Sequence, residues 1–200
     1  MGGLNLSKRY LVLDPSFRAF GWAVMTLEFE LIAYGCIKTE KELTIGVLSD
    51  QHRMEKLASE LKKVVDEYSI QAIVSEIPFG TQSASATRAL YICRGLVYTF
   101  AFLLGLPLAT IDPAAAKISL TGNYFADKVD MINAVQLRYP KIAALLSKEP
   151  LYLRETISDC VGILLAFTSG ETYESRDRTN SPRKRKRRGS KKVRSKRTGS

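Results

Sequence analysis

The sequence predicts an α/β fold: a mixed five-stranded sheet, made of an antiparallel meander plus parallel strands, with helices on both faces. Two observations support this fold class. Short β-rich apolar runs alternate with longer stretches of helical periodicity. Their order is three strands, a helix, a strand, a helix, a strand and then only helices. A crossover from the meander to a parallel strand is right-handed by default, which places helices on both sides of the sheet.

The first three strands are expected to pair as a meander. They are expected in residues 9–15, 20–29 and 31–39, and the last two are joined tightly near Glu28 to Glu30.

The remaining elements follow from helical spacing and stop signals. Apolar residues recur at helical spacing from Met54 to Tyr68, with Asp50 as the expected cap. Glycines mark the expected ends of later helices. The further elements are strands at 71–76 and 107–111, and helices at 83–104 (ending at Gly105), 113–120, 126–139 (after Gly122) and 151–168 (closed by Gly170).

Charge divides the 200-residue chain into two parts. The formal net charge is +10, and residues 171–200 alone hold thirteen Lys or Arg against three acids, which leaves residues 1–170 neutral. The segment 171–200 has almost no apolar residues, so it is expected to be a disordered basic tail after a folded domain at 1–170. Such a tail binds polyanions without reading sequence. We expect the tail to strengthen DNA binding, to act as a nuclear-targeting signal, or to bind RNA or a partner. The residues expected to make these contacts are Arg183, Lys184, Arg185, Lys186, Arg187 and Arg188.

Cysteine usage and hydropathy bear on the compartment. Cys36, Cys93 and Cys160 are odd in number, far apart and in apolar surroundings, so they are expected to be reduced and buried. The N-terminus lacks the apolar centre of a signal peptide, and the longest apolar stretch is shorter than a membrane helix needs. We therefore expect an intracellular protein of a reducing compartment, with no membrane partner. The cytoplasm of a bacterial or phage-infected cell is the expected location, or the nucleus if the source is eukaryotic or viral.

Acidic residues carry the main functional signal. Asp14 and Glu76 each end a buried apolar run, and Glu155 and Asp159 lie one helical turn apart in the last helix. Strand ends meet at the rim of a sheet, and a helix across that rim could bring the second pair to the same point. Four such charges cannot gather cheaply without cations between them. Oxygen-rich clusters suit Mg²⁺ or Mn²⁺, and such ions in pairs cut phosphodiesters. His52, the only histidine, lies far from these motifs and is not expected to act as a base.

Several motifs together resemble the RuvC-type Holliday junction resolvases of the ribonuclease H-like superfamily. The resemblance covers about residues 11–168. It rests on the order and spacing of "VLDPSFRAFGWAV", "IVSEIPF", "SASATRALYICRG", "LPLATIDPAAAKISLTGNYFADKVDM" and "ISDCVGILLAF".

The resemblance implies a homodimer that binds four-way DNA junctions and nicks two opposed strands, leaving 5′-phosphate and 3′-hydroxyl ends. It implies that Asp14, Glu76 and Asp159 bind two Mg²⁺ ions, for which Mn²⁺ substitutes, and that no small-molecule cofactor is needed. Lys117 and Lys128 match lysines near the site. They would stabilise the charge of the transition state or steer the attacking water.

Further residues are expected at the DNA and dimer surfaces. Phe79 matches an aromatic residue that stacks on bases at the crossover, and the helix around Arg94 and Gly95 would lie in the dimer interface. Arg88 and Arg94 would contact phosphates or pair with acids across the dimer, and the sequence does not choose between these roles.

The sequence departs from the family pattern in three places. Ser16 stands where the family has glycine, the basic tail is long, and Thr156 stands where many relatives have an aspartate three residues before Asp159. Glu155, on the same helix face, is therefore the candidate for the remaining ligand, with Asp127 or Asp130 as alternatives. These departures indicate a divergent branch, with a phage or virus as one candidate source.

Three other functions stay open at this stage. The same chemistry could act on flaps, replication forks or other branched DNA. A nucleotide-binding fold of the actin and sugar-kinase type shares the meander and an early aspartate, but it needs duplicated halves and Gly-rich phosphate loops that this chain lacks. A non-catalytic scaffold could bind branched DNA through the tail and an inactive site.

Overall fold

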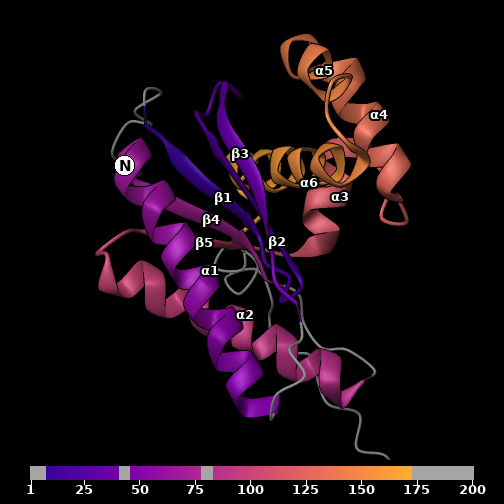
Figure 1. Ribbon diagram of the computed structural model, residues 1–200. Helices are drawn as coiled ribbons and strands as arrows, with labels where there is room; N and C mark the ends of the chain where they lie inside the picture. The colour runs from indigo at the N-terminus through magenta and orange to yellow at the C-terminus, as the bar shows by residue number, and fades with distance from the viewer. Residues whose placement is uncertain (1–7, 41–45, 78–82, 173–200) are drawn as a thin grey trace, which may run out of the picture.

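A computed structural model describes residues 8–40, 46–77 and 83–172 of the chain. Within these ranges five strands and six helices follow one another (Figure 1). In chain order they are β1 (Tyr10–Asp14), β2 (Ala19–Met25), β3 (Leu31–Lys38), α1 (Gly46–Tyr68), β4 (Ala72–Glu76), α2 (Ala84–Leu103), β5 (Leu108–Ile111), α3 (Pro113–Thr121), α4 (Lys128–Arg138), α5 (Pro140–Leu146) and α6 (Leu151–Thr168).

The five strands form one mixed sheet in the order β3-β2-β1-β4-β5. β1, β2 and β3 pair antiparallel, and β4 and β5 extend the sheet parallel to β1. The β2–β3 turn is closed by hydrogen bonds between Thr26 and both Phe29 and Glu30, with Phe29 at a φ of 61°. The predicted mixed five-stranded sheet with its N-terminal meander is therefore confirmed.

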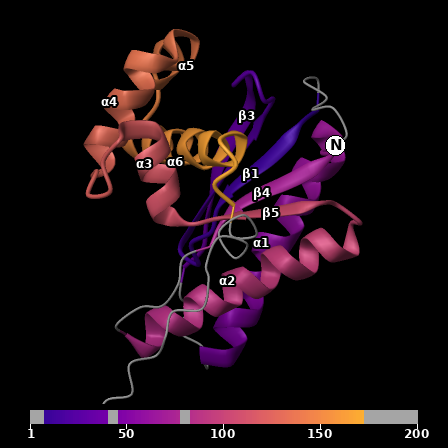
Figure 2. The same ribbon diagram turned by 180° about the vertical axis from the view of Figure 1, so that it is seen from behind.

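Helices cover both faces of this sheet, as the sequence predicts. In both views α1 and α2 lie on one side of the sheet, and α3, α4, α5 and α6 lie on the other (Figures 1 and 2). Alternation along the central strands separates two cores. Leu11, Leu13 and Ile73 pack with α1 and α2. Val12 and Val74 face α3–α6. The even-numbered residues of β1 and β4 therefore belong to the core on the α3–α6 side.

Four details differ from the sequence-based expectations. Asp50 does not cap α1, which begins at Gly46; instead, its carboxylate pairs with Arg53 and Arg88. Residues 140–146 form an additional helix, α5, because Pro140 begins a new helix after Tyr139 leaves the helical conformation. Cys36 is only partly buried because it lies on edge strand β3, whereas Cys93 and Cys160 are buried as expected, and all three thiols are free. The chain also pairs past residue 170, through a bridge between Thr172 and Ile111.

No helix among the described residues combines the length and apolar character needed to cross a membrane.

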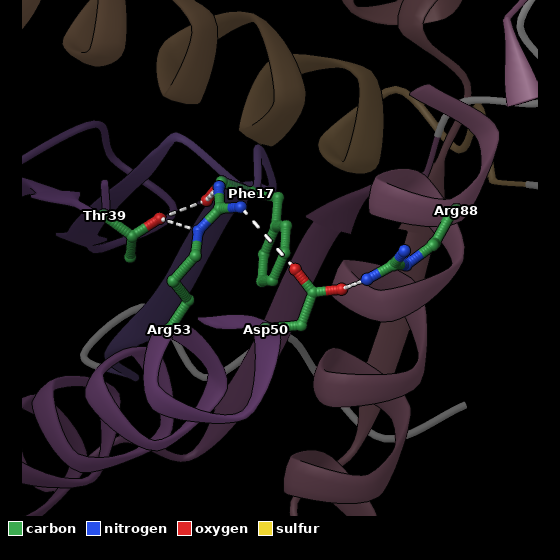
Figure 3. A network of polar contacts seen from close by, with 5 residues as sticks. All are labelled: Phe17, Thr39, Asp50, Arg53 and Arg88. Atoms are coloured by element: carbon green, nitrogen blue, oxygen red, sulfur yellow. Dashed lines mark hydrogen bonds and ion pairs between the residues drawn. The ribbon is translucent and has the colours of Figure 1, made fainter. Parts of the chain in front are cut away.

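A polar network ties the loop after β1 to the two helices of the first core (Figure 3). The Arg53 guanidinium on α1 stacks 3.7 Å from the centroid of the Phe17 ring and donates to the Phe17 carbonyl at 2.6 Å and to Thr39 Oγ1 at 2.9 Å. Asp50 bridges Arg53 to Arg88 on α2. Bonds to a guanidinium are among the stronger hydrogen bonds in proteins, so this network fixes the chain three residues after Asp14.

Two glycines let α6 approach closely on the other side. A Cβ at Gly21 of β2 would lie 2.9 Å from Cγ2 of Thr156, and a Cβ at Gly162 would lie 3.1 Å from the carbonyl oxygen of Ala116 on α3. The first distance is shorter than real Cβ contacts, and the second is tighter than most of them, so a side chain at either position would force its neighbours to shift. They set α6 against both the meander and α3.

Candidate active site

The sheet places Asp14 and Glu76 side by side. Asp14 ends β1 and Glu76 ends β4, and these strands are parallel neighbours in which Leu13 pairs with Ser75. Asp14 and Glu76 are the residues that directly follow this pair, so they lie next to each other at the ends of the two strands. By alternation they follow Val12 and Val74, and so they point to the face covered by α3–α6.

Three helices complete the same corner. α6 carries Asp159, whose helix is held against the meander by the glycine contacts. α3 carries Lys117 and is capped by Asp112, whose side chain accepts a hydrogen bond from the Ala114 N–H at 2.9 Å. α4 begins at Lys128, directly after its N-cap Asp127. Asp127 and Asp130 form a capping box, which fixes the first helical turn that carries the lysine.

These elements enclose a small cavity of about 90 Å³. Three acids and two lysines, all predicted as site residues, line it together with three apolar residues. The lining residues are Asp14, Glu76, Asp159, Lys117, Lys128, Pro113, Ala116 and Met131. Sequence reasoning missed the three apolar members, because Ala116 and Met131 have the spacing of ordinary core residues and Pro113 that of a helix start.

Burial and mutual repulsion raise the pKa of each acid in this cavity. Burial, and then the charge of Asp159, raises the pKa of Asp14 to about 7. Burial and the charge of Asp14 raise the pKa of Glu76 to about 8. Burial also raises the pKa of Asp159, against the lowering effect of Lys128. Without added cations the protein therefore holds part of this cluster protonated near neutral pH.

Lys128 pairs directly with one of the acids of the cavity. Its ammonium forms an ion pair with Asp159, whose side chain is 12 % exposed, while the lysine side chain is 55 % exposed. Asp159, Asp14 and Glu155 together raise the pKa of Lys128 against the effect of burial. The lysine therefore stays charged and sits at the mouth of the cavity, with part of its side chain in solvent.

Glu155 does not line the cavity, in contrast to the other three predicted acids. It lies one turn before Asp159 on α6 and is close enough to act on the pKa of Asp159 and Lys128. The two alternative ligands are engaged elsewhere. Asp127 accepts from the N–H groups of Val129 and Asp130, and the Asp130 side chain accepts from the Asp127 N–H, so both acids close the capping box of α4.

The residues of the cavity fit a hard divalent cation. All anionic groups in it are carboxylates, which are the ligands that Mg²⁺ and Mn²⁺ prefer. Burial, and then repulsion among the acids, raises the pKa values of Asp14 and Glu76, and a bound cation would offset both effects. The cluster is not a finished ligand set. Within the part of the chain that the structure describes, no three His, Cys, Asp or Glu side chains are gathered tightly enough to hold an ion. Like charges favour such spacing until a cation joins them.

The other predicted contact residues divide into two groups. Arg88 bonds to Asp50 and keeps a side chain that is 57 % exposed. Phe79 and the six basic residues predicted in the tail lie outside the described residues, as does nearly all of segment 171–200.

The fold and this site define a class of protein: a ribonuclease H-like α/β domain with a carboxylate cluster at the end of its central strands. The solved structure titled "T. thermophilus RuvC in complex with Holliday junction substrate" resembles the chain with a TM-score of 0.65 at 17 % identity, over 82 % of this chain and 98 % of that one. The yeast mitochondrial Holliday junction resolvase Ydc2 gives a TM-score of 0.58 at 10 % identity, over 83 % and 80 %.

Sequence comparison shows the family. The model of the family described as "Crossover junction endodeoxyribonuclease RuvC" matches residues 10–149. The proteins of that name from Rickettsia conorii and Wolbachia pipientis are 27 % and 28 % identical to the chain. The first match covers 82 % of this chain and 98 % of its relative, and the second covers 80 % and 95 %. The chain belongs to the RuvC family, as the sequence motifs predicted.

Proposed function

We propose that the protein is a structure-selective DNA endonuclease that resolves four-way junctions by paired nicks, leaving 5′-phosphate and 3′-hydroxyl ends. The observation that carries this proposal is the cavity in which Asp14, Glu76 and Asp159 meet Lys117 and Lys128. Membership of the RuvC family supports the same reaction, since its curated relatives are named crossover junction endodeoxyribonucleases.

The carboxylates are proposed to hold two Mg²⁺ ions, for which Mn²⁺ substitutes. Asp14, at the centre of the cluster, would contact both, Glu76 would complete one and Asp159 the other, with Glu155 as an outlying contributor. Two such ions would supply an activated water and neutralise charge on the leaving oxygen. Burial, and then repulsion among the acids, raises the pKa values of Asp14 and Glu76 in the metal-free protein, and bound cations would remove the repulsion.

The lysines are proposed to bind the scissile phosphate. The Lys128 ammonium already pairs with Asp159 at the mouth of the cavity, and about half of the lysine side chain is exposed to solvent. A phosphate that enters the cavity offers it a second anionic partner, so that Lys128 can neutralise charge as it develops in the transition state. Lys117 lies on α3 and lines the cavity from that helix. Its charge acts against the rise in the pKa of Glu76.

Paired nicks require two active sites, and α2 offers a surface for a homodimer. Tyr91, Tyr98, Phe102 and Leu103 are exposed apolar or aromatic residues on this helix, and a Cβ at Gly95 would meet open space. Arg94 contacts Tyr98 through its guanidinium. Exposed apolar stripes of this kind mark protein interfaces. Replacing Phe102 with Glu should halve the mass that sedimentation reports, and an unchanged mass would place the interface elsewhere.

The test of the function is cleavage of a labelled panel in Mg²⁺: four-way junctions, forks, flaps and linear duplex. The expected result is preferential cutting of junctions by paired nicks. Asp14→Asn should abolish cleavage and retain junction binding, because the change leaves the fold and the lysines in place. Preference for flaps or forks would keep the chemistry and reassign the substrate. Binding by the wild type without any cleavage would identify a scaffold, and equal cutting of linear duplex would refute junction selectivity.

A further inference from the structure

Two aromatic side chains stand out from the turn between α3 and α4. Tyr124 is 57 % exposed and Phe125 is 84 % exposed, and their ring centroids lie 5.0 Å apart with the planes at 78°. Aromatic side chains gain free energy by burial, so two adjacent rings in solvent mark a surface that something else covers.

The turn holds the rings outward in a fixed arrangement. The Thr121 hydroxyl accepts from the Asn123 N–H at 3.0 Å, and Asn123 Oδ1 accepts from the Phe125 N–H at 2.9 Å. Ala126, the next residue, is 1 % exposed and anchors the turn in the core. Gly122, with a φ of 74°, permits the left-handed conformation that starts the turn. The exposed rings therefore sit on a rigid support.

The same turn connects the two lysines of the candidate active site. Lys117 lies on α3 before the turn, and Lys128 begins α4, three residues after Phe125. Both line the catalytic cavity. The two acids of the segment, Asp127 and Asp130, are occupied in the capping box. A nucleic acid strand whose phosphate enters the cavity between these lysines therefore passes close to the aromatic pair.

We propose that Tyr124 and Phe125 form a stacking site for an unpaired or unstacked base of the DNA substrate beside the scissile phosphate. This inference rests on the proposed function and specifies how branched DNA would be distinguished from duplex. Aromatic faces next to basic side chains are the common means of holding unstacked bases, and they tolerate any base. A junction offers such bases at its crossover, whereas an intact duplex keeps its bases stacked.

The experiment measures DNA binding by the full chain in buffer with EDTA, which prevents cleavage. Two double variants remove the rings: Tyr124→Ser with Phe125→Ser, and Tyr124→Leu with Phe125→Leu, which keeps apolar volume. Leu137→Ser on α4 is the matched control, since Leu137 is 85 % exposed and lies outside the turn. The probes are a four-way junction with 2-aminopurine at the crossover and a linear duplex of the same length.

Both double variants should bind the junction about 10-fold more weakly, as expected for loss of stacking on one base. Their duplex affinity should equal that of the wild type, and the salt dependence should stay the same because no phosphate contact is removed. The fluorescence of 2-aminopurine should change when the wild-type protein binds the junction, and it should change less when either double variant binds. Because the rings are exposed, melting temperatures should match the wild type.

Three results would overturn the inference. Equal junction affinity of the wild type and both double variants would refute the stacking site while leaving the proposed function intact. Loss of self-association with unchanged DNA affinity would assign the rings to a protein interface. Failure of the wild type to bind any junction would refute the proposed function, and the stacking site with it.

Discussion

Replacing Asp14 with Asn should stabilise the metal-free protein, although it removes a proposed ligand. In the folded protein the pKa of Asp14 is raised from 3.8 to about 7. A tenfold change in proton affinity corresponds to about 1.4 kcal/mol. The cost of ionising Asp14 inside the folded chain is therefore up to about 4 kcal/mol, part of which belongs to its interaction with Asp159.

The sign of the pH dependence follows from the direction of this shift. Between pH 4 and about pH 7 the unfolded chain releases the Asp14 proton and the folded chain retains it, so the free energy of unfolding falls as pH rises. Asn cannot ionise and escapes this loss. Its advantage over the wild type should be small near pH 4 and complete above pH 7.

Thermal denaturation in EDTA, followed by circular dichroism at pH 5 and pH 8, measures the effect. At pH 8 a gain of about 2 kcal/mol would raise the melting temperature by roughly 4–8 °C for a chain of this size. At pH 5 the gain should be less than half as large. Asp66→Asn is the control, because Asp66 is 58 % exposed in a surface pair with Lys62 and should change stability by less than about 0.5 kcal/mol. An Asp14→Asn variant that is no more stable than the wild type at pH 8, or whose gain does not depend on pH, would refute the reasoning.

Three further predictions concern the cation, the helix contact and the polar network. Mg²⁺ or Mn²⁺ should raise the wild-type melting temperature in a concentration-dependent manner at pH 8 and have little effect on Asp14→Asn; equal shifts in both would place the cation elsewhere. Gly21→Ala should lower the free energy of unfolding by about 1–3 kcal/mol in urea denaturation, because its Cβ meets Thr156 at 2.9 Å; an unchanged midpoint would contradict that contact. Arg53→Ala should lower the free energy of unfolding by about 2 kcal/mol in the same assay, because it removes the contact with the Phe17 ring and two hydrogen bonds to the Phe17 carbonyl and Thr39 Oγ1, which keep only their bond to each other; Arg53→Lys should recover less than half of this, because an ammonium cannot both stack and bond in a fork.

The position of the candidate active site could be predicted because its determinants are local. Asp14 and Glu76 each follow a buried strand, and parallel pairing of those strands dictates that the two acids meet. Helical spacing placed Asp159 on a face that could reach them. The same local reasoning could not place Glu155, because a difference of one turn along α6 decides whether a side chain enters the cavity or stays beside it.

Tertiary partners explain most of the remaining differences. Asp50 has the sequence signature of a cap, but α1 starts earlier and Arg88, 38 residues away, takes its carboxylate. Asp127 and Asp130 were candidate ligands by composition alone, and the capping box that occupies them depends on where α4 begins. The ion pair of Lys128 with Asp159 joins residues 31 positions apart and has no signature in the sequence.

The sheet divides the molecule into two cores with different constraints. Among the residues that the structure describes, the side chains that line the proposed catalytic cavity come from β1, β4 or the helices on one face, and none comes from α1 or α2. Substitutions in the opposite layer can therefore accumulate without altering the proposed metal-binding chemistry, provided that Arg53 still holds the loop behind Asp14. The surface of α2 that we propose for subunit association is therefore free to diverge, while the layer that lines the cavity must keep its carboxylates and lysines for the proposed reaction.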